Sequence, residues 1–546
     1  MSAATRTQVC QVNDLGEGEK REVQIGDSSV LLVRHRGQYH ALAPKCTHYG
    51  GPLVKGVLST DGCITCPWHG ASFNVKTGDI EDAPALNPLK TFPVVVEGDA
   101  VYVEASAADL QSNQSQYGRC SRLKVDTPRV VIVGGGSGGM ATAESLCQYQ
   151  FQGSITMVSA EPYTPIDRPK LSKSFNPQHQ QIALRSDDQL RERGITVHTA
   201  TPATGIDTEQ RQVIIKDGRR LPYDTLVLAT GGIPNVPPFP HVDLDNVFTL
   251  RSAVNAQNIA QALIHFAGGQ TQEDVTADKM AKVRLVVIGS SFISMEYASV
   301  AKKQGVDVTV IGMTKVPFQA ALGEQIGGAL ADLHREKGVK LRMECKVKGL
   351  VPSQADPQRV GAVELDSGEQ VSADVVLLGV GVKPNTEWLA NTAIPRLENQ
   401  SVEVNDRLQV KGFTDIYAVG DIASHPSPMG NTLTRIEHWD VAQNMGRCVG
   451  LNVARGPSPY RAVPYFWTMQ FGKSLRYCGH ALEYDDVIIH GSLKEGRWAA
   501  FFAKGEEILA VASLAYDPIV SKCAQMVRKL WCLTLVGVPG HESRVG

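Results

Sequence analysis

The sequence predicts an α/β protein that begins with an all-β domain, and three features support this fold class. Residues 1–105 read as short strands separated by Gly and Asp-Gly turns, a pattern typical of a small β-barrel or sandwich. From residue 128 onward, buried apolar strands alternate with helical patterns, as in βαβ units. Residues 456–546 return to strand-like alternation, which indicates a C-terminal α+β domain.

The same patterns divide the chain into domains. Residues 1–105 form the all-β domain, and residues 106–127, rich in Ser and Gln and without periodicity, form a linker. Two similar strand–turn–helix segments, RVVIVGGGSGGM and VRLVVIGSSFIS, indicate an internal duplication of a nucleotide-binding unit. We therefore expect one Rossmann-like domain over 128–252 and 382–455, a second over 253–381, and the C-terminal domain over 456–546.

Composition and charge exclude several classes of function. The chain is 42% hydrophobic and 20% charged, and its 54 Lys and Arg nearly balance its 56 Asp and Glu. This balance argues against nucleic acid or an anionic membrane as a partner. The nearest candidate for a transmembrane segment, Leu530 to Val538, is too short to span a bilayer. The 11 Cys without a secretion signal indicate a reducing compartment. We expect a cytoplasmic location because the N-terminus carries no clear targeting peptide. Mitochondrial association stays open.

Two pairs of Cys and His in the first domain predict a metal centre. Cys46-x-His48 and Cys66-x-x-His69 each lie in a tight loop with Gly and Pro. Two thiolates and two imidazoles are the ligands of a Rieske-type [2Fe–2S] cluster. A structural zinc ion is the alternative, but zinc modules usually pair Cys with Cys and His with His. The segments CTHYGGPL and CITCPWHGASF resemble the Rieske ferredoxin family, which favours the cluster.

A glycine-rich turn at the start of the first Rossmann-like domain predicts a dinucleotide site. Gly134-x-Gly136-x-x-Gly139 follows the strand VVIV and opens a helix, so backbone N–H groups can approach a pyrophosphate. Glu161 ends the next strand, where a carboxylate binds a ribose hydroxyl. We expect FAD here. The other residues of this turn assigned to the cofactor are Ser137 and Gly138.

The second unit departs from the same pattern. The expected glycine motif reads Gly289-Ser290-Ser291-Phe292-Ile293-Ser294, so Ser replaces the second and third glycines. Gly312 stands where NAD-selective enzymes usually carry an acid, and Lys315 is the nearby cation that could meet a 2′-phosphate. We expect NAD(P)H to bind here, and both the tightness of binding and the choice between NADH and NADPH stay open. The residues assigned to it are Gly289, Ser291, Phe292, Ile293 and Gly381.

Further segments resemble the glutathione-reductase superfamily. TDIYAVGDIA resembles its second FAD motif, which implies that Asp421 binds the ribityl chain. LVLATGG and LGVGVKPN match its crossover strands. Disulfide reductases of this superfamily carry a Cys pair against the flavin, but the first flavin-side helix here has only Cys147, so dithiol chemistry is unlikely.

PYTPIDRPKLSK resembles the active-site segment of apoptosis-inducing factor and oxygenase-coupled ferredoxin reductases. The resemblance implies that Arg168 steadies FAD and that Lys173 lies beside the flavin ring, paired with Glu296. A cation there stabilises negative charge on reduced flavin, so Lys173 and Glu296 are the expected catalytic pair. The same resemblance assigns further residues to the cofactor, although a core role for the last is nearly as plausible: Arg251, His438, Trp439 and Trp467.

Taken over nearly its whole length, the chain resembles the Rieske-fused apoptosis-inducing factor-like family. The resemblance implies a glutathione-reductase-like fold with a C-terminal domain of the dimerisation type, so a homodimer is possible. It also implies an oxidoreductase that passes electrons from NAD(P)H through FAD to the cluster. The expected partners are the nicotinamide nucleotide and an unknown acceptor, either a protein or a small molecule.

Two other functions stay open. The first is a redox-sensing, pro-apoptotic interaction protein with slow turnover, which the Ser-substituted second motif mildly favours. The second is a nitrite-reductase-like or oxygenase-coupled reductase component. The lack of a sirohaem-ligating Cys cluster argues against the nitrite-reductase form.

Overall fold

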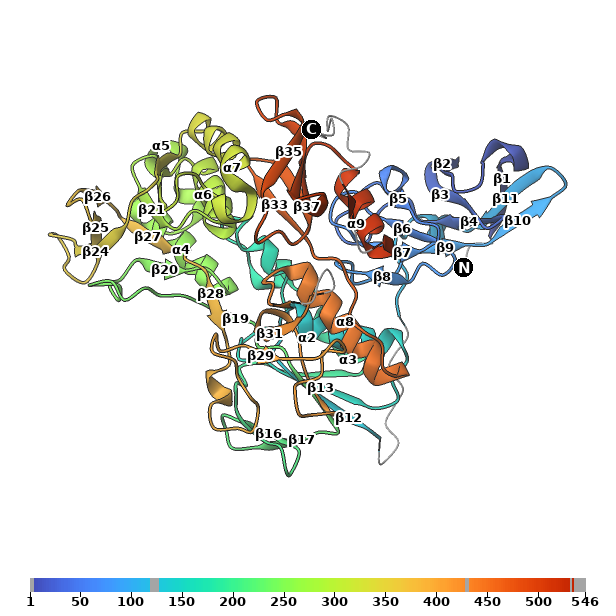
Figure 1. Cartoon of the computed structure of the whole chain (residues 1–546), viewed down its shortest axis with the longest axis horizontal. Coiled ribbons are helices and arrows are strands. Elements are labelled where there is room, and N and C mark those ends of the chain that lie inside the picture. The colour runs from blue at the N-terminus through green and yellow to red at the C-terminus, as the bar shows by residue number, and fades with distance from the viewer. Residues whose placement is uncertain (1–3, 118–126, 428–431, 531–532, 535–546) are drawn as a thin grey trace.

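The computed structural model describes residues 4–117, 127–427, 432–530 and 533–534. In Figure 1 the N-terminal strands lie at one end of the molecule and the second nucleotide-binding unit lies at the other. The first unit lies below them, and the C-terminal sheet stands between the two ends. In the described part of the chain, no helix is both long and apolar enough to cross a bilayer.

The N-terminal module, residues 4–117, consists of three antiparallel sheets. Their strand orders are β1 (Thr5–Gln11), β11 (Ala100–Ala105), β10 (Val94–Glu97); β2 (Lys20–Ile25), β3 (Ser28–His35), β4 (Gln38–Leu42), β9 (Thr91–Phe92); and β5 (Val57–Leu58), β6 (Cys63–Thr65), β7 (Ser72–Asn74), β8 (Ile80–Asp82). Apolar residues of the second and third sheets share one core. The β6–β7 hairpin and the loop closed by the Lys45–Pro52 bridge carry the four predicted metal ligands.

The first part of the predicted linker lies against this module. Helix α1 (Ala107–Leu110) is capped by the Ser106 hydroxyl, Gln114 pairs with Leu89, and the Tyr117 hydroxyl accepts a hydrogen bond from the Ile80 N–H at 3.1 Å. These contacts join segments far apart in the sequence, which local periodicity does not reveal. Residues 118–126 of the predicted linker lie outside the described residues.

The first nucleotide module is built on five parallel strands. Their order is β14 (Ile195–His198), β13 (Ser154–Val158), β12 (Arg129–Val133), β18 (Thr225–Leu228), β30 (Ile416–Ala418). Helix α2 (Ser137–Gln148) follows β12 and packs on α8 (Trp439–Arg455). The two helices meet closely, since a Cβ at Gly446 would lie 2.2 Å from the Gly138 carbonyl oxygen. Smaller elements complete the module: α3 (Asp187–Glu192), β15 (Ala203–Asp207), β16 (Gln212–Ile215), β17 (Arg220–Pro222), β29 (Val402–Glu403), β31 (Ala423–Pro426) and β32 (Leu433–Thr434).

The second nucleotide module repeats this plan. Its parallel strands have the order β20 (Val247–Thr249), β27 (Val375–Leu378), β21 (Arg284–Ile288), β22 (Asp307–Ile311), β23 (Lys340–Arg342). Its helices are α4 (Ala253–Phe266), α5 (Ala277–Met280), α6 (Phe292–Lys303) and α7 (Gln319–Glu336). An antiparallel sheet flanks it, with strands β24 (Val347–Pro352), β25 (Val360–Leu365) and β26 (Gln370–Ser372). The paired strands β19 (Gly232–Pro234) and β28 (Val382–Pro384) connect the two nucleotide modules.

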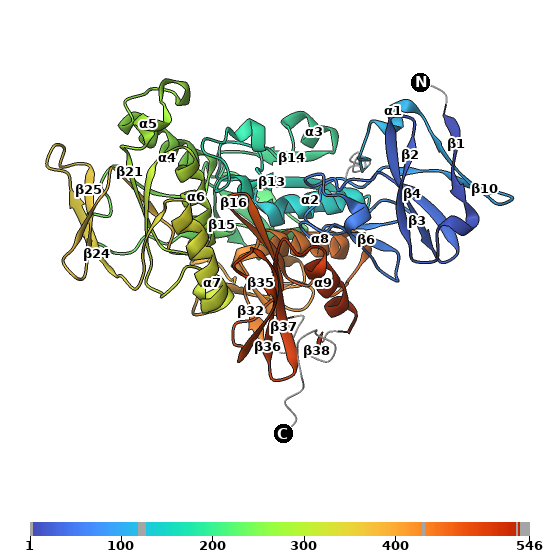
Figure 2. The ribbon, with the colours of Figure 1, turned by 90° about the horizontal axis from the view of Figure 1, so that it is seen from above.

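The C-terminal module is an antiparallel sheet covered by one helix. The strand order is β33 (Tyr465–Gln470), β34 (Lys473–Gly479), β37 (Glu507–Leu514), β36 (Arg497–Lys504), β35 (Asp486–Ser492), and β38 (Leu533–Thr534) pairs with β37. Seen from above, helix α9 (Ile519–Leu530) lies between this sheet and the N-terminal module (Figure 2). The four modules confirm the predicted fold class, an α/β protein with an N-terminal all-β domain and a C-terminal α+β domain.

Candidate functional site

The predicted metal ligands come together as two pairs. Cys46 and Cys66 are 2% and 1% exposed, and their thiols lie within hydrogen-bond distance of each other. The Nδ1 atoms of His48 and His69 face each other at 3.2 Å. Among the described residues, no three His, Cys, Asp or Glu converge on a single ion. A thiol pair beside an imidazole pair matches two irons with different ligands better than one tetrahedral zinc ion.

The backbone around these ligands fits a cluster. The N–H groups of His48 and Tyr49 point at the Cys46 sulfur, and those of Trp68 and His69 point at the Cys66 sulfur. Hydrogen bonds to the sulfurs are typical of iron–sulfur sites and help to set their potential. Burial lowers the pKa of His48 to about 3 and lowers that of His69, so both imidazoles are neutral, the form that binds metal.

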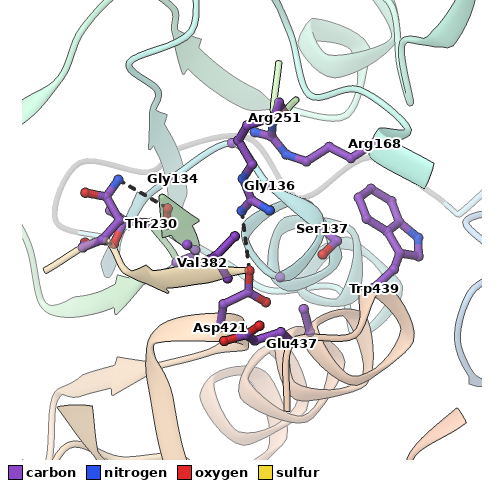
Figure 3. A pocket seen from close by; sticks show the side chains of 18 of the residues that line it. Gly134, Gly136, Ser137, Arg168, Thr230, Arg251, Val382, Asp421, Glu437 and Trp439 are labelled. Atoms are coloured by element: carbon purple, nitrogen blue, oxygen red, sulfur yellow. Dashed lines mark hydrogen bonds and ion pairs between the residues drawn. The ribbon is translucent and has the colours of Figure 1, made fainter. Parts of the chain in front are cut away.

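A cavity of about 620 Å³ opens at the carboxyl end of the first parallel sheet (Figure 3). Its size suits a large cofactor. Gly134 has φ +119°, and a Cβ there would lie 2.2 Å from the Ala229 carbonyl oxygen. A Cβ at Gly139 would lie 2.1 Å from the Gly134 carbonyl oxygen. Both positions therefore require glycine, and the turn brings the N-terminus of α2, capped by Gly136, to the cavity as a pyrophosphate site requires.

Charged residues predicted from separate segments form one network at this cavity. Arg168 pairs with Glu161 at 2.8 Å and donates to the Arg251 carbonyl oxygen at 2.6 Å. Arg251 lies 3.4 Å from Asp421, as Figure 3 shows. The Glu161 carboxylate, which lines the cavity, is thus held by Arg168, a pairing that the sequence did not indicate.

Aromatic residues also line the cavity. His438, Trp439 and Trp467 all border the cavity. Burial lowers the pKa of His438 to about 3, and its Nδ1 has no hydrogen-bond partner among the described residues. Buried polar atoms normally have a hydrogen-bond partner. A cofactor bound in the cavity would supply the partner that His438 Nδ1 lacks, so this wall of the cavity also fits a cofactor.

The predicted catalytic pair forms at the same cavity. Lys173 Nζ lies 2.8 Å from Glu296 Oε2, with side chains 16% and 5% exposed. Lys173 comes from the segment after η3 (Arg168–Lys170), and Glu296 comes from α6 of the second nucleotide module. The pair therefore joins the two modules beside the cavity.

The Ser-substituted motif keeps the geometry of a nucleotide turn. Gly289 has φ +105°, and Ser291 precedes α6 as its N-cap. Ser294 donates to the Gly379 carbonyl oxygen at 3.1 Å, and it fits because the facing residue is also glycine. Phe292 and Ile293 line the cavity, whereas Gly289, Ser291 and Gly381 lie outside its lining.

The N-terminal module seats its metal loops on this cavity wall. The ring centroids of His69 and His48 lie 4.5 Å and 5.6 Å from that of Trp467. Ser521 in α9 donates to the Cys66 carbonyl oxygen at 3.0 Å. Tyr49 stacks on His48 and its hydroxyl donates to Asp167, next to Arg168. Trp467 thus contacts both histidines that are predicted metal ligands, and it lines the cavity.

Sequence reasoning missed several residues of the site. Glu437 and Asp440 line the cavity and belong to the IEHWD segment, which also contains the predicted residues His438 and Trp439. Their position beside these two residues could have identified them. Tyr49 directly follows His48 and could have been found in the same way. Thr468 donates to Glu296 at 2.6 Å, and nothing in the local sequence of its strand marks that role.

Comparison with known proteins connects the geometry to families. Family models match residues 128–446 as pyridine nucleotide-disulphide oxidoreductase, 5–93 as Rieske [2Fe-2S] domain and 465–530 as reductase C-terminal. Human apoptosis-inducing factor 3 is 38% identical over 525 residues, covering 95% of this chain and 83% of the relative. Rhodocoxin reductase of Rhodococcus erythropolis is 32% identical, covering 70% and 86%. The covalent complex of putidaredoxin reductase with putidaredoxin superposes with a TM-score of 0.68 at 30% identity, covering 74% and 94%.

Proposed function

The chain belongs to the pyridine nucleotide-disulphide oxidoreductase family, in the branch of the Rieske-fused apoptosis-inducing factor 3 proteins, and on that premise we propose that its N-terminal module is a built-in electron acceptor for its own flavin site. The protein is a FAD-dependent NAD(P)H oxidoreductase of the ferredoxin reductase type that carries a Rieske [2Fe–2S] domain. FAD exchanges the electron pair of a nicotinamide for single electrons, and the cluster accepts one electron at a time.

The contact of His48 and His69 with Trp467 is the observation that carries this proposal. Trp467 lines the cavity on β33, so one side chain adjoins both candidate cofactor sites. Its side chain is 9% exposed and contacts both histidines of the metal loops. Cys46, His48, Cys66 and His69 would hold the cluster, and the turn from Gly134 to Gly139 would hold the FAD pyrophosphate.

Relatives support the same arrangement from another direction. Putidaredoxin reductase has been solved in a covalent complex with putidaredoxin, a separate protein. We infer that the N-terminal module takes that place here, on the same chain. The final acceptor is then a protein or small molecule that takes electrons from the cluster. A homodimer and a cytoplasmic location stay predictions, which analytical ultracentrifugation and cell fractionation would test.

Replacing Trp467 tests the proposal. With Trp467→Leu, we expect flavin reduction by NADH to stay within about twofold and cluster reduction to slow by about tenfold or more, because the metal loops lose their seat on the cavity wall. Stopped-flow absorbance follows the flavin, and electron paramagnetic resonance of frozen samples follows the cluster. Trp467→Phe keeps an aromatic ring and should retain most of the rate. Equal cluster rates in wild type and Trp467→Leu would contradict the proposal.

A slow redox sensor is the second candidate function, and one observation favours it. Ser291 and Ser294 stand where glycines bring the backbone close to the nucleotide. Stopped-flow reduction of the holoprotein by NADH and NADPH separates the two functions. Flavin reduction within milliseconds supports the enzyme, whereas reduction over minutes with a lasting charge-transfer band supports the sensor.

A further inference from the structure

The Lys173–Glu296 pair is tied to residues that do not line the cavity. Glu296 is 4% exposed and accepts from four donors. Lys173 Nζ at 2.8 Å and the Ser172 hydroxyl contact Oε2, while the Thr468 hydroxyl at 2.6 Å and the Met469 N–H at 3.4 Å contact Oε1. A buried ion pair is stable only when its remaining lone pairs are satisfied, so the Oε1 contacts are as necessary as the lysine.

Thr468 begins a chain of hydrogen bonds that ends on another helix. Its Oγ1 accepts from Gln470 Nε2 at 2.8 Å, and Gln470 Oε1 lies 3.1 Å from His334 Nε2. These three residues are 0%, 1% and 0% exposed. Burial lowers the pKa of His334 to about 4, so its imidazole is neutral and carries one N–H, which the Gln470 carbonyl oxygen accepts.

The number of available protons favours one donor-to-acceptor direction for this series of hydrogen bonds. Thr468 has one hydroxyl proton, and because its oxygen already accepts from the Gln470 amide, the proton is free for Glu296. If the Gln470 amide were reversed, its oxygen would face Thr468 and compete with Glu296 for that single proton. Glu296 Oε1 would then retain only the longer Met469 contact. In the observed arrangement, His334 therefore donates to Gln470, Gln470 to Thr468, and Thr468 to the Glu296 carboxylate.

We infer that Thr468, Gln470 and His334 are positioning residues that hold Glu296, and through it the Lys173 ammonium, at the cavity. The chain links α7 and α6 of the second nucleotide module to β33 of the C-terminal module. A second contact, from the Phe471 N–H to Ser299 Oγ at 2.8 Å, fixes α6 on the same strand. The inference rests on the proposed function only for its kinetic consequence, because the contacts exist without any cofactor.

Thr468→Val tests the inference, because it keeps the shape and removes the donor. We expect kcat for flavin reduction by NADH to fall about tenfold, the effect of losing one hydrogen bond to a charged group, with little change in KM. Thr468→Ser should restore most of the rate. Gln470→Leu removes the next link and should act in the same direction with a smaller effect. Ser513→Ala is the matched control, since this buried hydroxyl of the same sheet has no partner among the described residues.

Thermal unfolding of the apoprotein gives a readout that does not depend on activity. We expect the loss of melting temperature from Thr468→Val to shrink by at least half in a Glu296→Ala background, because the partner is already gone. An equal loss in both backgrounds, or a kcat for Thr468→Val equal to that of Ser513→Ala, would overturn the inference. Failure of the proposed function would look different, because it leaves flavin reduction intact and changes only cluster reduction.

Discussion

At the scale of single residues, Asp440 carries an energetic cost inside the site. Its carboxyl group is 2% exposed, one oxygen accepts from Asn444 Nδ2 at 3.0 Å, and the other has no partner among the described residues. Burial raises the pKa of Asp440 well above its usual range. The folded protein therefore keeps a proton that the unfolded chain releases above pH about 4.

Asp440→Asn should remove this cost. With a raised pKa in the folded state, the free energy of unfolding falls as the pH rises from the unfolded pKa toward the folded pKa, by up to about 1.4 kcal/mol per pH unit. We expect wild type and Asp440→Asn to differ little at pH 4 and the variant to gain stability relative to wild type as the pH rises above 4. Denaturant unfolding of the apoprotein across this range measures it. Glu506→Gln, at an exposed turn, is the control, and parallel pH profiles for wild type and Asp440→Asn would contradict the assignment.

A residue of this site could be predicted from the sequence when its role depends on neighbours only a few positions away in the chain. Gly134 and Gly139 were predictable because a tight turn before a helix needs them within a few residues. Cys66 and His69 were predictable for the same reason. The Thr468–Glu296 contact joins residues that are separated by 172 positions in the chain, and the partnership exists only after two modules pack. Such contacts are set by tertiary structure, so no local pattern contains them.

At the scale of elements, two side chains crowd the end of the strand in the second nucleotide turn. A Cβ at Gly312, directly after β22, would lie 2.6 Å from Ser290 Oγ and 2.7 Å from Met343 Cε, so these side chains occupy the space that a side chain at 312 would need. Lys315 is paired with Glu324 at 2.8 Å on the surface. The position where NAD-selective enzymes carry an acid is thus crowded, which the sequence alone does not show.

Making room at position 290 and placing an acid at position 312 should change nucleotide preference. We expect Ser290→Gly with Gly312→Glu to raise the preference for NADH over NADPH about tenfold, because a carboxylate there binds the ribose hydroxyls and repels a 2′-phosphate. Gly312→Glu alone should lose stability through the clash with Ser290. Rates of flavin reduction at varied NADH and NADPH concentrations give both KM values. An unchanged ratio of kcat/KM in the double variant would show that the ribose does not bind at this turn.

The secondary-structure elements also show which parts of the fold could not be predicted from the local sequence. The short strands of the N-terminal module and the two βαβ units follow from apolar periodicity, which each segment carries within itself. Residues 107–117 read as a linker because they lack that periodicity, yet Tyr117 and Gln114 fix them to the N-terminal module. Their order comes from hydrogen bonds to distant residues rather than from an amphipathic pattern.

At the scale of the whole molecule, four arginines fasten the N-terminal module to the rest of the chain. Arg185 donates to the Leu86 carbonyl oxygen and to Asn87, Arg447 to the Ile80 carbonyl oxygen, and Arg476 to the Trp68 carbonyl oxygen. Arg528 of α9 pairs with Asp82. They come from different elements of the first nucleotide and C-terminal modules. The interface therefore holds the metal loops in one orientation relative to the cavity.

Arg528 lies in an acidic part of this interface. Asp61, Glu81 and Asp82 of the N-terminal module all raise the pKa of its guanidinium, Asp82 most strongly. Arg528 thus lies among three carboxylates of the N-terminal module. Complementary charge of this kind fixes the register of two surfaces, and its reversal places like charges in contact.

Charge reversal at Arg528 tests whether this orientation serves electron transfer. We expect Arg528→Glu to slow cluster reduction about tenfold while flavin reduction by NADH is unchanged, since repulsion from Asp82 and its neighbours lifts the metal loops from Trp467. Combining it with Asp82→Arg should recover part of the rate, because one attractive pair is restored with opposite signs. Single-turnover kinetics measures both rates, and small-angle scattering should show a larger radius of gyration only in Arg528→Glu. If that variant expands and still reduces its cluster at the wild-type rate, the docked orientation is not the one that transfers electrons.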